Sequence, residues 1–342
     1  MNWVAESVVN FLFLVNLLTC FTFRSMEQIE MLEAVSNECE MTWKLQWSTL
    51  PHDLLSQIID RLGLIEFLSF HGVCKDWRIA SMRSSPEEKS RDLWFLIYGE
   101  GSNCSLLSKQ DKLYNIELPE LVGATCLASY KGWLLLFCNG AMFFFSPFSR
   151  AKIDVPNCPI TELSDHVAAF SCDPTSQNCI IAVISRTSDE ELELHMLFKG
   201  SSQWSKCNFS CDKPNLNTIR GAMFHNGEFN FLDRFEGLVT FDACKNKEWN
   251  SYRLVKNDKS VKNVLDYYIQ RDYCVVKDIK RKMELEDNVS ITTCGTFHLR
   301  GKHNILVPGE TIEAAEGSES TNNLKGVWIQ PRYFHIEPNQ SW

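Results

Sequence analysis

Cysteine and histidine are the residues of this sequence best suited to chemistry, and both are numerous. The chain of 342 residues contains 14 cysteines and 8 histidines. A cysteine held next to a histidine can act as a nucleophile, because the imidazole accepts the thiol proton. His166, His195 and His225 are candidates for such a histidine. Pairs of this kind are expected by chance at these numbers, so the sequence identifies no catalytic residue.

A metal or phosphate site would need ligands in a tighter arrangement than the sequence offers. Zinc sites use pairs of closely spaced ligands, and Cys207 and Cys211 form one pair without a second Cys or His pair at a suitable distance. Gly99-Glu100-Gly101 lacks the third glycine of a nucleotide-binding loop, and P-loop, HExxH and GxSxG motifs are absent. We therefore expect a protein with no metal, no cofactor and no enzymatic activity.

Charged and aromatic clusters have simpler explanations than a binding site. The acidic run Asp189–Glu193 is typical of a solvated loop, and the cluster Lys277–Lys282 is typical of a solvated face. Trp133, Trp204 and Trp249 could line a ligand pocket, but we expect them in a hydrophobic core. The net charge of −9 and the pI near 5.5 argue against a nucleic-acid partner, which would need clustered Lys and Arg.

The composition predicts a folded protein in a reducing compartment. Hydrophobic residues make up 44% of the chain and aromatic residues 12%, which is enough for a large core. The cysteines are irregularly spaced without any CxxC pair, and a chain of this size does not need disulfides. We therefore expect free thiols and a location in the cytoplasm, the nucleus or both.

Residues 1–46 are expected to precede the folded domains. The apolar stretch Val8–Phe23 is shorter than the about 20 residues that span a bilayer. Glu6 stands where a signal peptide would carry positive charge, and no cleavage site follows. We interpret the stretch as a leader or an upstream extension, with Met26 or Met31 as an alternative start. A flexible acidic segment follows it and leads to the folded domains. A weak signal peptide or an anchor is the alternative.

The stretch from Leu50 to Ser81 has the apolar periodicity of helices. At 100° per residue, its first part places an apolar group on one side and its polar residues on the other. That group consists of Leu54, Leu55, Ile58, Ile59 and Leu62. Pro51 suits the first turn of this helix, and Gly63 ends it.

A second short helix is expected after Gly63, and a third carries Val73, Trp77 and Ala80 at helical spacing. Three helices of this size bury too little surface to be comfortably stable alone. We expect them to offer their remaining apolar surface to a partner. The alternative is that they only cap the domain that follows.

From Leu93 onward, short apolar runs separated by turn residues predict a β domain. Two hairpins, Trp133–Phe145 and Gly221–Leu232, each turn at an Asn-Gly pair. Strands ending in Phe145, Phe198 and Phe241 recur at separations of 53 and 43 residues, close to the period of about 40–50 that is typical of propeller blades, of which about five would fit. A β-sandwich is the alternative.

The sequence therefore predicts an α+β multidomain chain. Residues 47–86 form a small three-helix module, with a boundary at Ser84-Ser85-Pro86. Residues 87–342 form an all-β, degenerate propeller-like domain, in which 287–327 are polar and poorly defined.

The helical block resembles an F-box across about 35 positions. The matching order is Leu50-Pro51-x-Asp53-Leu54-Leu55-x-x-Ile58-x-x-x-Leu62, then Val73-Cys74-Lys75-x-Trp77-Arg78. The β domain resembles that of plant F-box/kelch-repeat-like proteins. The likeness of the whole chain to this family runs from about residue 47 to 255. The motifs that carry this likeness are Gly132-Trp133-Leu134-Leu135-Leu136, Phe143-Phe144-Phe145-Ser146-Pro147-Phe148 and Ala169-Phe170-Ser171-Cys172-x-Pro174-Thr175-Ser176.

The resemblance implies a non-catalytic substrate-recognition subunit of an SCF-type ubiquitin ligase. Its F-box would dock on a Skp-family adaptor joined to a cullin, and its kelch-like β domain would hold an unknown target protein. The resemblance assigns adaptor binding to Leu50, Pro51, Leu54, Leu55, Ile58, Ile59, Leu62, Val73, Cys74 and Trp77. The alternative function is a propeller-like carbohydrate-binding or glycosidase-type protein with a helical cap.

Overall fold

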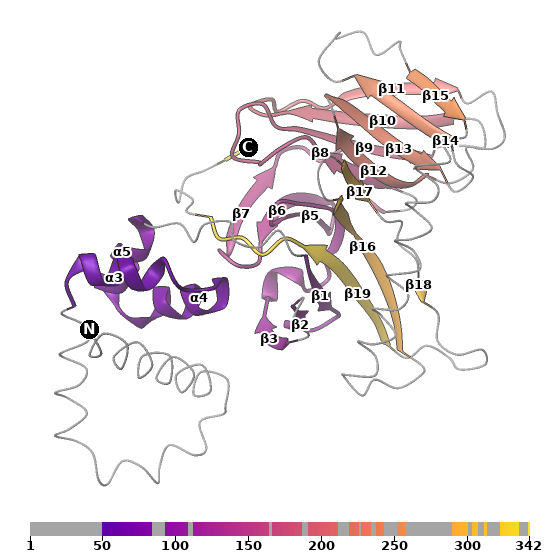
Figure 1. Cartoon of the computed structure of the whole chain (residues 1–342). Coiled ribbons are helices and arrows are strands. Elements are labelled where there is room, and N and C mark those ends of the chain that lie inside the picture. The colour runs from indigo at the N-terminus through magenta and orange to yellow at the C-terminus, as the bar shows by residue number, and fades with distance from the viewer. Residues whose placement is uncertain are drawn as a thin grey trace. The chain divides into compact units, whose positions relative to one another are not determined.

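The computed structural model describes residues 50–83, 93–108, 112–163, 166–186, 191–210, 219–225, 227–233, 237–242, 252–256, 289–299, 303–306, 311–312, 322–334 and 341–342. The chain divides into two compact units, Met1–Ser90 and Arg91–Trp342. The described α-helices belong to the first unit, and the described strands and the short 3-10 helix η2 (Pro119–Leu121) belong to the second (Figure 1). Within the described ranges, no helix is long and apolar enough to cross a membrane. The stretches Val8–Phe23 and Lys277–Lys282 lie outside the described residues.

The described part of the first unit, residues 50–83, forms three short helices, as the sequence predicts. They are α3 (His52–Ile59), α4 (Leu64–Val73) and α5 (Lys75–Arg83). Pro51 lies immediately before α3 rather than in its first turn, and its carbonyl accepts the backbone N–H groups of Leu54 and Leu55 at 3.0 and 3.1 Å. α3 ends at Ile59, so the predicted helix is too long and Leu62 lies outside it, whereas Gly63 precedes α4 with an extended backbone.

One detail of the predicted third helix is wrong. Val73 is the last residue of α4, and Cys74 has an extended backbone that separates α4 from α5. Trp77 and Ala80 are buried in α5, whereas Val73 is exposed. The spacing of Val73 and Trp77 is helical in sequence, but the chain turns between them.

The described strands of the second unit include three antiparallel sheets of four strands, each in sequence order. The first sheet is β4 (Thr125–Tyr130), β5 (Trp133–Cys138), β6 (Ala141–Ser146) and β7 (Ala151–Val155). The second is β8 (Val167–Phe170), β9 (Ile180–Arg186), β10 (Glu191–Phe198) and β11 (Ser205–Ser210). The third is β12 (Ile219–His225), β13 (Glu228–Asp233), β14 (Gly237–Asp242) and β15 (Tyr252–Lys256).

A fourth sheet joins strands from both ends of this unit. Its early strands are β1 (Trp94–Tyr98), β2 (Asn103–Leu107) and β3 (Leu113–Glu117). Its late strands are β16 (Val289–Leu299), β17 (His303–Leu306), β18 (Thr311–Ile312) and β19 (Asn322–Ile329). β19 runs antiparallel to β1 and parallel to β16, and Figure 1 shows β16 and β19 side by side.

The four sheets form a closed, propeller-like ring. The innermost strands touch in order, since β4 contacts β8, β8 contacts β12, β12 contacts β17, and β16 contacts β4. The repeat spacing predicted about five blades, but the described residues form four sheets. The difference arises because β1–β3 and β16–β19 pair into one sheet instead of making separate blades.

The predicted turns and strand ends match this architecture. Asn139 and Gly140 have φ angles of 49° and 78°, which join β5 to β6 through the expected Asn-Gly turn. Gly227 has a φ of 85° at the turn between β12 and β13, while its partner Asn226 lies outside the described residues. The recurrent phenylalanines Phe145, Phe198 and Phe241 all lie in the third strands of their sheets.

Both faces of the inner strands are buried, which explains their unbroken apolar runs. Side chains of the first and second sheets share one core, and side chains of the second and third sheets share another. Trp133 is fully buried in the first of these cores, as expected. Trp204 packs at its margin and donates from Nε1 to the Pro156 carbonyl at 3.0 Å, and Trp249 lies outside the described residues.

The β unit should fold without the helices, because its described sheets close a core of their own. We expect residues 88–342, produced alone, to give strand-rich circular dichroism and one cooperative melting transition. A disordered product would show that the two units share a core and would contradict the separation of the domains.

Candidate adaptor-docking site

The apolar residues of α3 divide between the core and the surface. Leu55 and Ile59 are buried, whereas Leu54 leaves 45% of its surface exposed and Ile58 is half-buried. Adjacent residues differ by 100° around a helix, so Leu54 lies at the edge of the apolar side of α3 while Leu55 lies nearer its middle. One side of α3 therefore packs in the core of the helical unit, whereas Leu54 is exposed to solvent.

The ten residues assigned to adaptor binding separate in the same way. Leu55, Ile59, Leu62 and Trp77 are buried, so these four contribute to the core of the unit instead of its surface. Leu50 and Cys74 are half-buried, and Pro51 and Val73 are exposed. The docking hypothesis therefore narrows to Leu50, Pro51, Leu54, Ile58, Val73 and Cys74.

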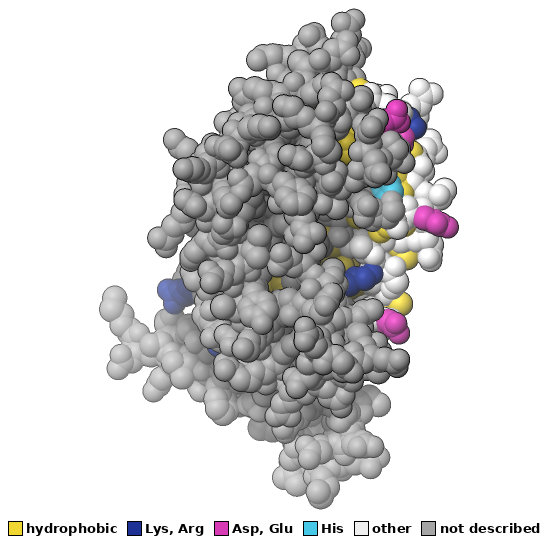
Figure 2. Space-filling view, turned by 90° about the vertical axis from the view of Figure 1, so that its right-hand side faces the viewer, with side chains coloured by type: hydrophobic (Ala, Val, Ile, Leu, Met, Phe, Trp, Pro, Cys, Tyr) yellow, Lys and Arg dark blue, Asp and Glu magenta, His cyan; other side chains and the backbone are white. Residues whose placement is uncertain are grey.

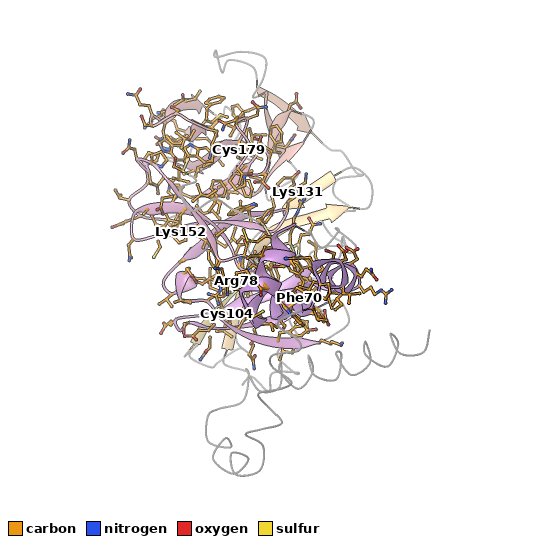
Figure 3. The ribbon with its side chains drawn as sticks, turned by 90° about the vertical axis from the view of Figure 1, so that its left-hand side faces the viewer. Phe70, Arg78, Cys104, Lys131, Lys152 and Cys179 are labelled. Carbon is orange, nitrogen blue, oxygen red and sulfur yellow. The ribbon has the colours of Figure 1, made fainter. Side chains whose placement is uncertain are left out.

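Contacts among the helices hold the surface residues in fixed positions. The rings of Phe70 and Trp77 lie 4.4 Å apart and join α4 to α5. His71 Nδ1 lies 2.6 Å from Ser81 Oγ, which in turn donates to the Arg78 carbonyl at 2.7 Å. Figure 3 shows Phe70 and Arg78 on these helices. The polar link and the aromatic pair hold two helices at one angle, so apolar groups on their outer sides keep their spacing.

Met82 is an exposed apolar residue that the motif did not include. Its side chain is 58% exposed at the end of α5, and Val73 at the end of α4 is 43% exposed. Its position five residues after the buried Trp77 gives a turn of 500°, or 140° away from Trp77 around the helix axis. That spacing was available in the sequence as a sign that Met82 faces outward.

The histidine of the β unit with the best-defined surroundings is a structural residue. His195 is buried in β10, and its Nε2 lies 2.8 Å from Oε1 of Glu193. Lys206, opposite His195 on β11, contacts the other carboxylate oxygen. The expectation of a solvated loop is therefore wrong for Glu191–Glu193, which belong to β10, and Glu193 is only 14% exposed between His195 and Lys206. Asp189 and Glu190 lie outside the described residues.

Burial lowers the pKa of His195, and the nearby Lys206 acts in the same direction while Glu193 opposes both. The folded state therefore binds the proton more weakly than the unfolded state, whose histidine titrates near 6.5. Stability from this residue should be fully present above about pH 6.5 and decline as the pH falls. Melting between about pH 5 and 8 should show this acid loss, and the loss should be smaller in His195→Gln. Equal pH dependence in the two proteins would contradict the assignment.

The remaining candidates for chemistry belong to separate strands and turns of the β unit. Gly99-Glu100-Gly101 forms the turn between β1 and β2, so it is a hairpin connection and not a phosphate loop. Cys207 is half-buried in β11, and Cys211 lies outside the described residues. Among the described residues, no group of three or more His, Cys, Asp or Glu side chains is placed to hold a metal ion. His166 is partly exposed, and the side chain of His225 is not described.

The surface in Figure 2 displays the described charges singly. Acidic and basic side chains are interspersed there with hydrophobic and uncharged groups, and the described Lys and Arg residues do not gather into one patch on this face.

Comparison with known protein families divides the chain as the fold does. The F-box domain matches residues 47–89, and the KIB1-4 beta-propeller matches residues 104–295. The latter covers more than half of the chain and includes the strands from β2 to the first part of β16.

Similar curated proteins come from the plant Arabidopsis thaliana. F-box protein At3g56470 is 29% identical over 206 residues, which cover 59% of this chain and 55% of that protein. F-box protein At1g49360 is 30% identical over 227 residues, covering 63% of this chain and 47% of that protein. F-box/kelch-repeat protein At1g57790 is 26% identical and covers 60% and 58%. The chain spans about half the length of the curated relatives it matches.

Solved structures with some likeness include the WD40 domain of SCAP from fission yeast. The match has a TM-score of 0.26 and 12% identity, covering 50% of this chain and 43% of the other. AztD of Citrobacter koseri matches with a TM-score of 0.28 and 11% identity, covering 50% and 60%. The matched families, the three helices and the ring of sheets lead to one conclusion: the chain belongs to the KIB1-4 beta-propeller family and carries an F-box domain ahead of its propeller.

Proposed function

We propose that this protein is the substrate-recognition subunit of an SCF-type ubiquitin ligase. Its helical unit docks on a Skp-family adaptor that is joined to a cullin. The β unit holds a target protein. The observation that carries the proposal is the exposure of Pro51, Leu54 and Val73 on a unit that also matches the F-box domain.

The exposed apolar groups support docking, because their burial in an interface is favourable. Removing a leucine side chain from water contributes roughly 1.5–3 kcal/mol, and a few such anchors usually dominate an interface. Leu54 and Pro51 lie in one turn, tied by the hydrogen bond from the Leu54 N–H to the Pro51 carbonyl. They therefore enter an interface already ordered and lose little conformational freedom there.

The protein itself performs no bond chemistry in this proposal. Holding a target beside a ubiquitin-charged enzyme raises the effective concentration of the target's lysines, and this alone accelerates the transfer. The function also requires a location in the cytoplasm or the nucleus, where the ligase and free thiols coexist.

Affinity capture from plant cells tests the proposal. The tagged chain should recover a Skp-family adaptor and a cullin in comparable amounts, and a chain lacking residues 47–86 should recover neither. Recovery of equal amounts of both with the shortened chain would overturn the assignment of docking to the helical unit.

A further inference from the structure

Two cysteines face each other where β8 turns into β9. The antiparallel pairing of these strands continues past their ends, since the Ser171 N–H donates to the Ile180 carbonyl at 2.9 Å. The next opposed pair is Cys172 and Cys179, and the Cys179 thiol lies 3.3 Å from the Cys172 carbonyl oxygen. Opposed residues of such a pair have Cα atoms roughly 4.5–5.5 Å apart, within the range that a disulfide can bridge.

The connecting loop is held in a single shape by its own polar groups. Asp173 accepts hydrogen bonds from the Thr175 N–H at 2.9 Å and from the Thr175 hydroxyl at 2.7 Å. The Ser176 N–H donates to the Asp173 carbonyl, and the Cys179 N–H donates to the Ser176 carbonyl. These two successive tight turns keep the two cysteines opposed to each other, with no long loop to close.

Lys199 fastens this loop to its surroundings. Its ammonium group donates to the Pro174 carbonyl at 2.9 Å and to the Ser341 carbonyl at 2.8 Å, and its backbone N–H donates to the Cys179 carbonyl. Cys179 is fully buried, whereas Cys172 is partly exposed (Figure 3 labels Cys179 among the sheets). The pair therefore has one sulfur that a small reagent can reach and a second behind it.

The surroundings shift the pKa values of the two thiols in opposite directions. A hydrogen bond from the Cys179 thiol is the main cause that lowers the pKa of Cys172 to about 6, and the hydroxyls of Ser176 and Ser171 add to it. The pKa of Cys179 is raised, first because its proton is held against Cys172 and second because of burial. Burial instead raises the pKa of Cys104 to about 11. Cys172 is thus a partly exposed thiolate beside a thiol that still carries its proton.

We propose that Cys172 and Cys179 form an oxidisable dithiol, which a hydroperoxide converts into an intramolecular disulfide. The Cys172 thiolate attacks one peroxide oxygen, the O–O bond breaks, and the departing oxygen takes a proton, leaving a sulfenic acid on Cys172. The Cys179 sulfur then attacks the Cys172 sulfur. The S–O bond breaks, and hydroxide leaves with the Cys179 proton as water. Two thiols are oxidised by two electrons in total, and one peroxide is reduced.

Hydrogen peroxide added to the full chain tests the proposal. Trypsin should release residues 153–186 as one peptide, which contains both cysteines and also Cys158. After mild oxidation and alkylation, this peptide should be two hydrogen atoms lighter and carry one alkyl group, on Cys158. Treatment with a dithiol reductant should restore three alkylation sites. A peptide that keeps all three thiols while other cysteines are oxidised would overturn the proposal.

Reaction rates and variants separate this site from general oxidation. At pH 7 the thiolate fraction of Cys172 exceeds that of Cys104 by roughly four orders of magnitude. A thiolate of lower pKa is a weaker nucleophile, and this difference reduces the advantage of Cys172 by about two and a half orders of magnitude. Alkylation of Cys172 should therefore be at least tenfold faster. Cys172→Ser should abolish the disulfide, and Cys179→Ser should leave a sulfenic acid that dimedone traps. Cys158→Ser, the matched control, should keep the disulfide. Loss of the disulfide in Cys158→Ser would overturn the pairing of Cys172 with Cys179. If Cys179→Ser fails to fold, the mass of the oxidised wild-type peptide tests the proposal.

Discussion

Leu54→Asp should weaken binding of the Skp-family adaptor at least tenfold while the helical unit keeps its fold. Leu54 is exposed in the first turn of α3 and is not one of the buried core residues. A carboxylate in the first turn also suits the helix dipole. In an apolar interface, however, the variant loses the leucine and buries a charge, and a tenfold loss corresponds to only about 1.4 kcal/mol. Titration of the purified adaptor by calorimetry measures the change.

Gln57→Asp is the matched control for this experiment. Gln57 is exposed on the same helix and gains the same charge, yet it lies on the polar side of α3. The affinity of this variant for the adaptor should stay within about threefold of the wild type, because a substitution on a polar surface usually changes the free energy by at most about 0.5 kcal/mol. Equal affinities of the wild type and Leu54→Asp, with unchanged circular dichroism, would remove the strongest support for docking through α3.

Gly326→Val should lower the stability of the β unit by about 3 kcal/mol, the upper end of the usual cost of overpacking. Gly326 lies in β19 opposite Ile97 of β1, and a Cβ atom there would lie 2.3 Å from the ring of Phe95. Phe95 is fully buried and packs on Trp328 at 4.8 Å, so its ring has little room to move. The melting temperature should fall by roughly 6–12 °C in a unit of this size.

Two further variants decide whether the clash is the cause. In the double variant Phe95→Ala with Gly326→Val, the new side chain occupies the space that the ring leaves. The loss of stability in the double variant should therefore be smaller than the sum of the losses in the two single variants. Gly101→Val is the matched control, because nothing lies within 4 Å of a Cβ at that position. A similar loss of stability at both glycines would show that valine acts through the backbone and not through Phe95.

The helical unit was largely predictable from sequence because its signals are local. Amphipathic spacing, Pro51 before the first helix and Gly63 before the second are all read within a few residues of the feature that they determine. Periodicity could not divide Leu54 from Leu55, because both belong to the apolar arc of α3 and only the packing of α5 against α3 selects the buried one.

The β unit was predictable in its hairpins but not in its closure. Asn139-Gly140 encodes its turn directly, whereas the pairing of β19 with β1 joins residues from opposite ends of the unit and leaves no local signal. The closing strand also lies in a segment that reads as polar. Glu193 shows a missed signal, since Leu192, Leu194 and Met196 alternate with it in a strand pattern and point into the core.

The pairing of β1 with β19 also sets an order of events during synthesis. β1 ends at Tyr98 and β19 begins at Asn322, so about 220 residues separate the two. At 5–20 residues per second, the ribosome needs roughly 10–45 seconds to supply the partner of β1. During that interval β1 (WFLIY) presents one unpaired edge, and such edges invite pairing with other chains. The nascent protein should therefore depend on chaperones that shield this edge until Asn322–Ile329 has emerged.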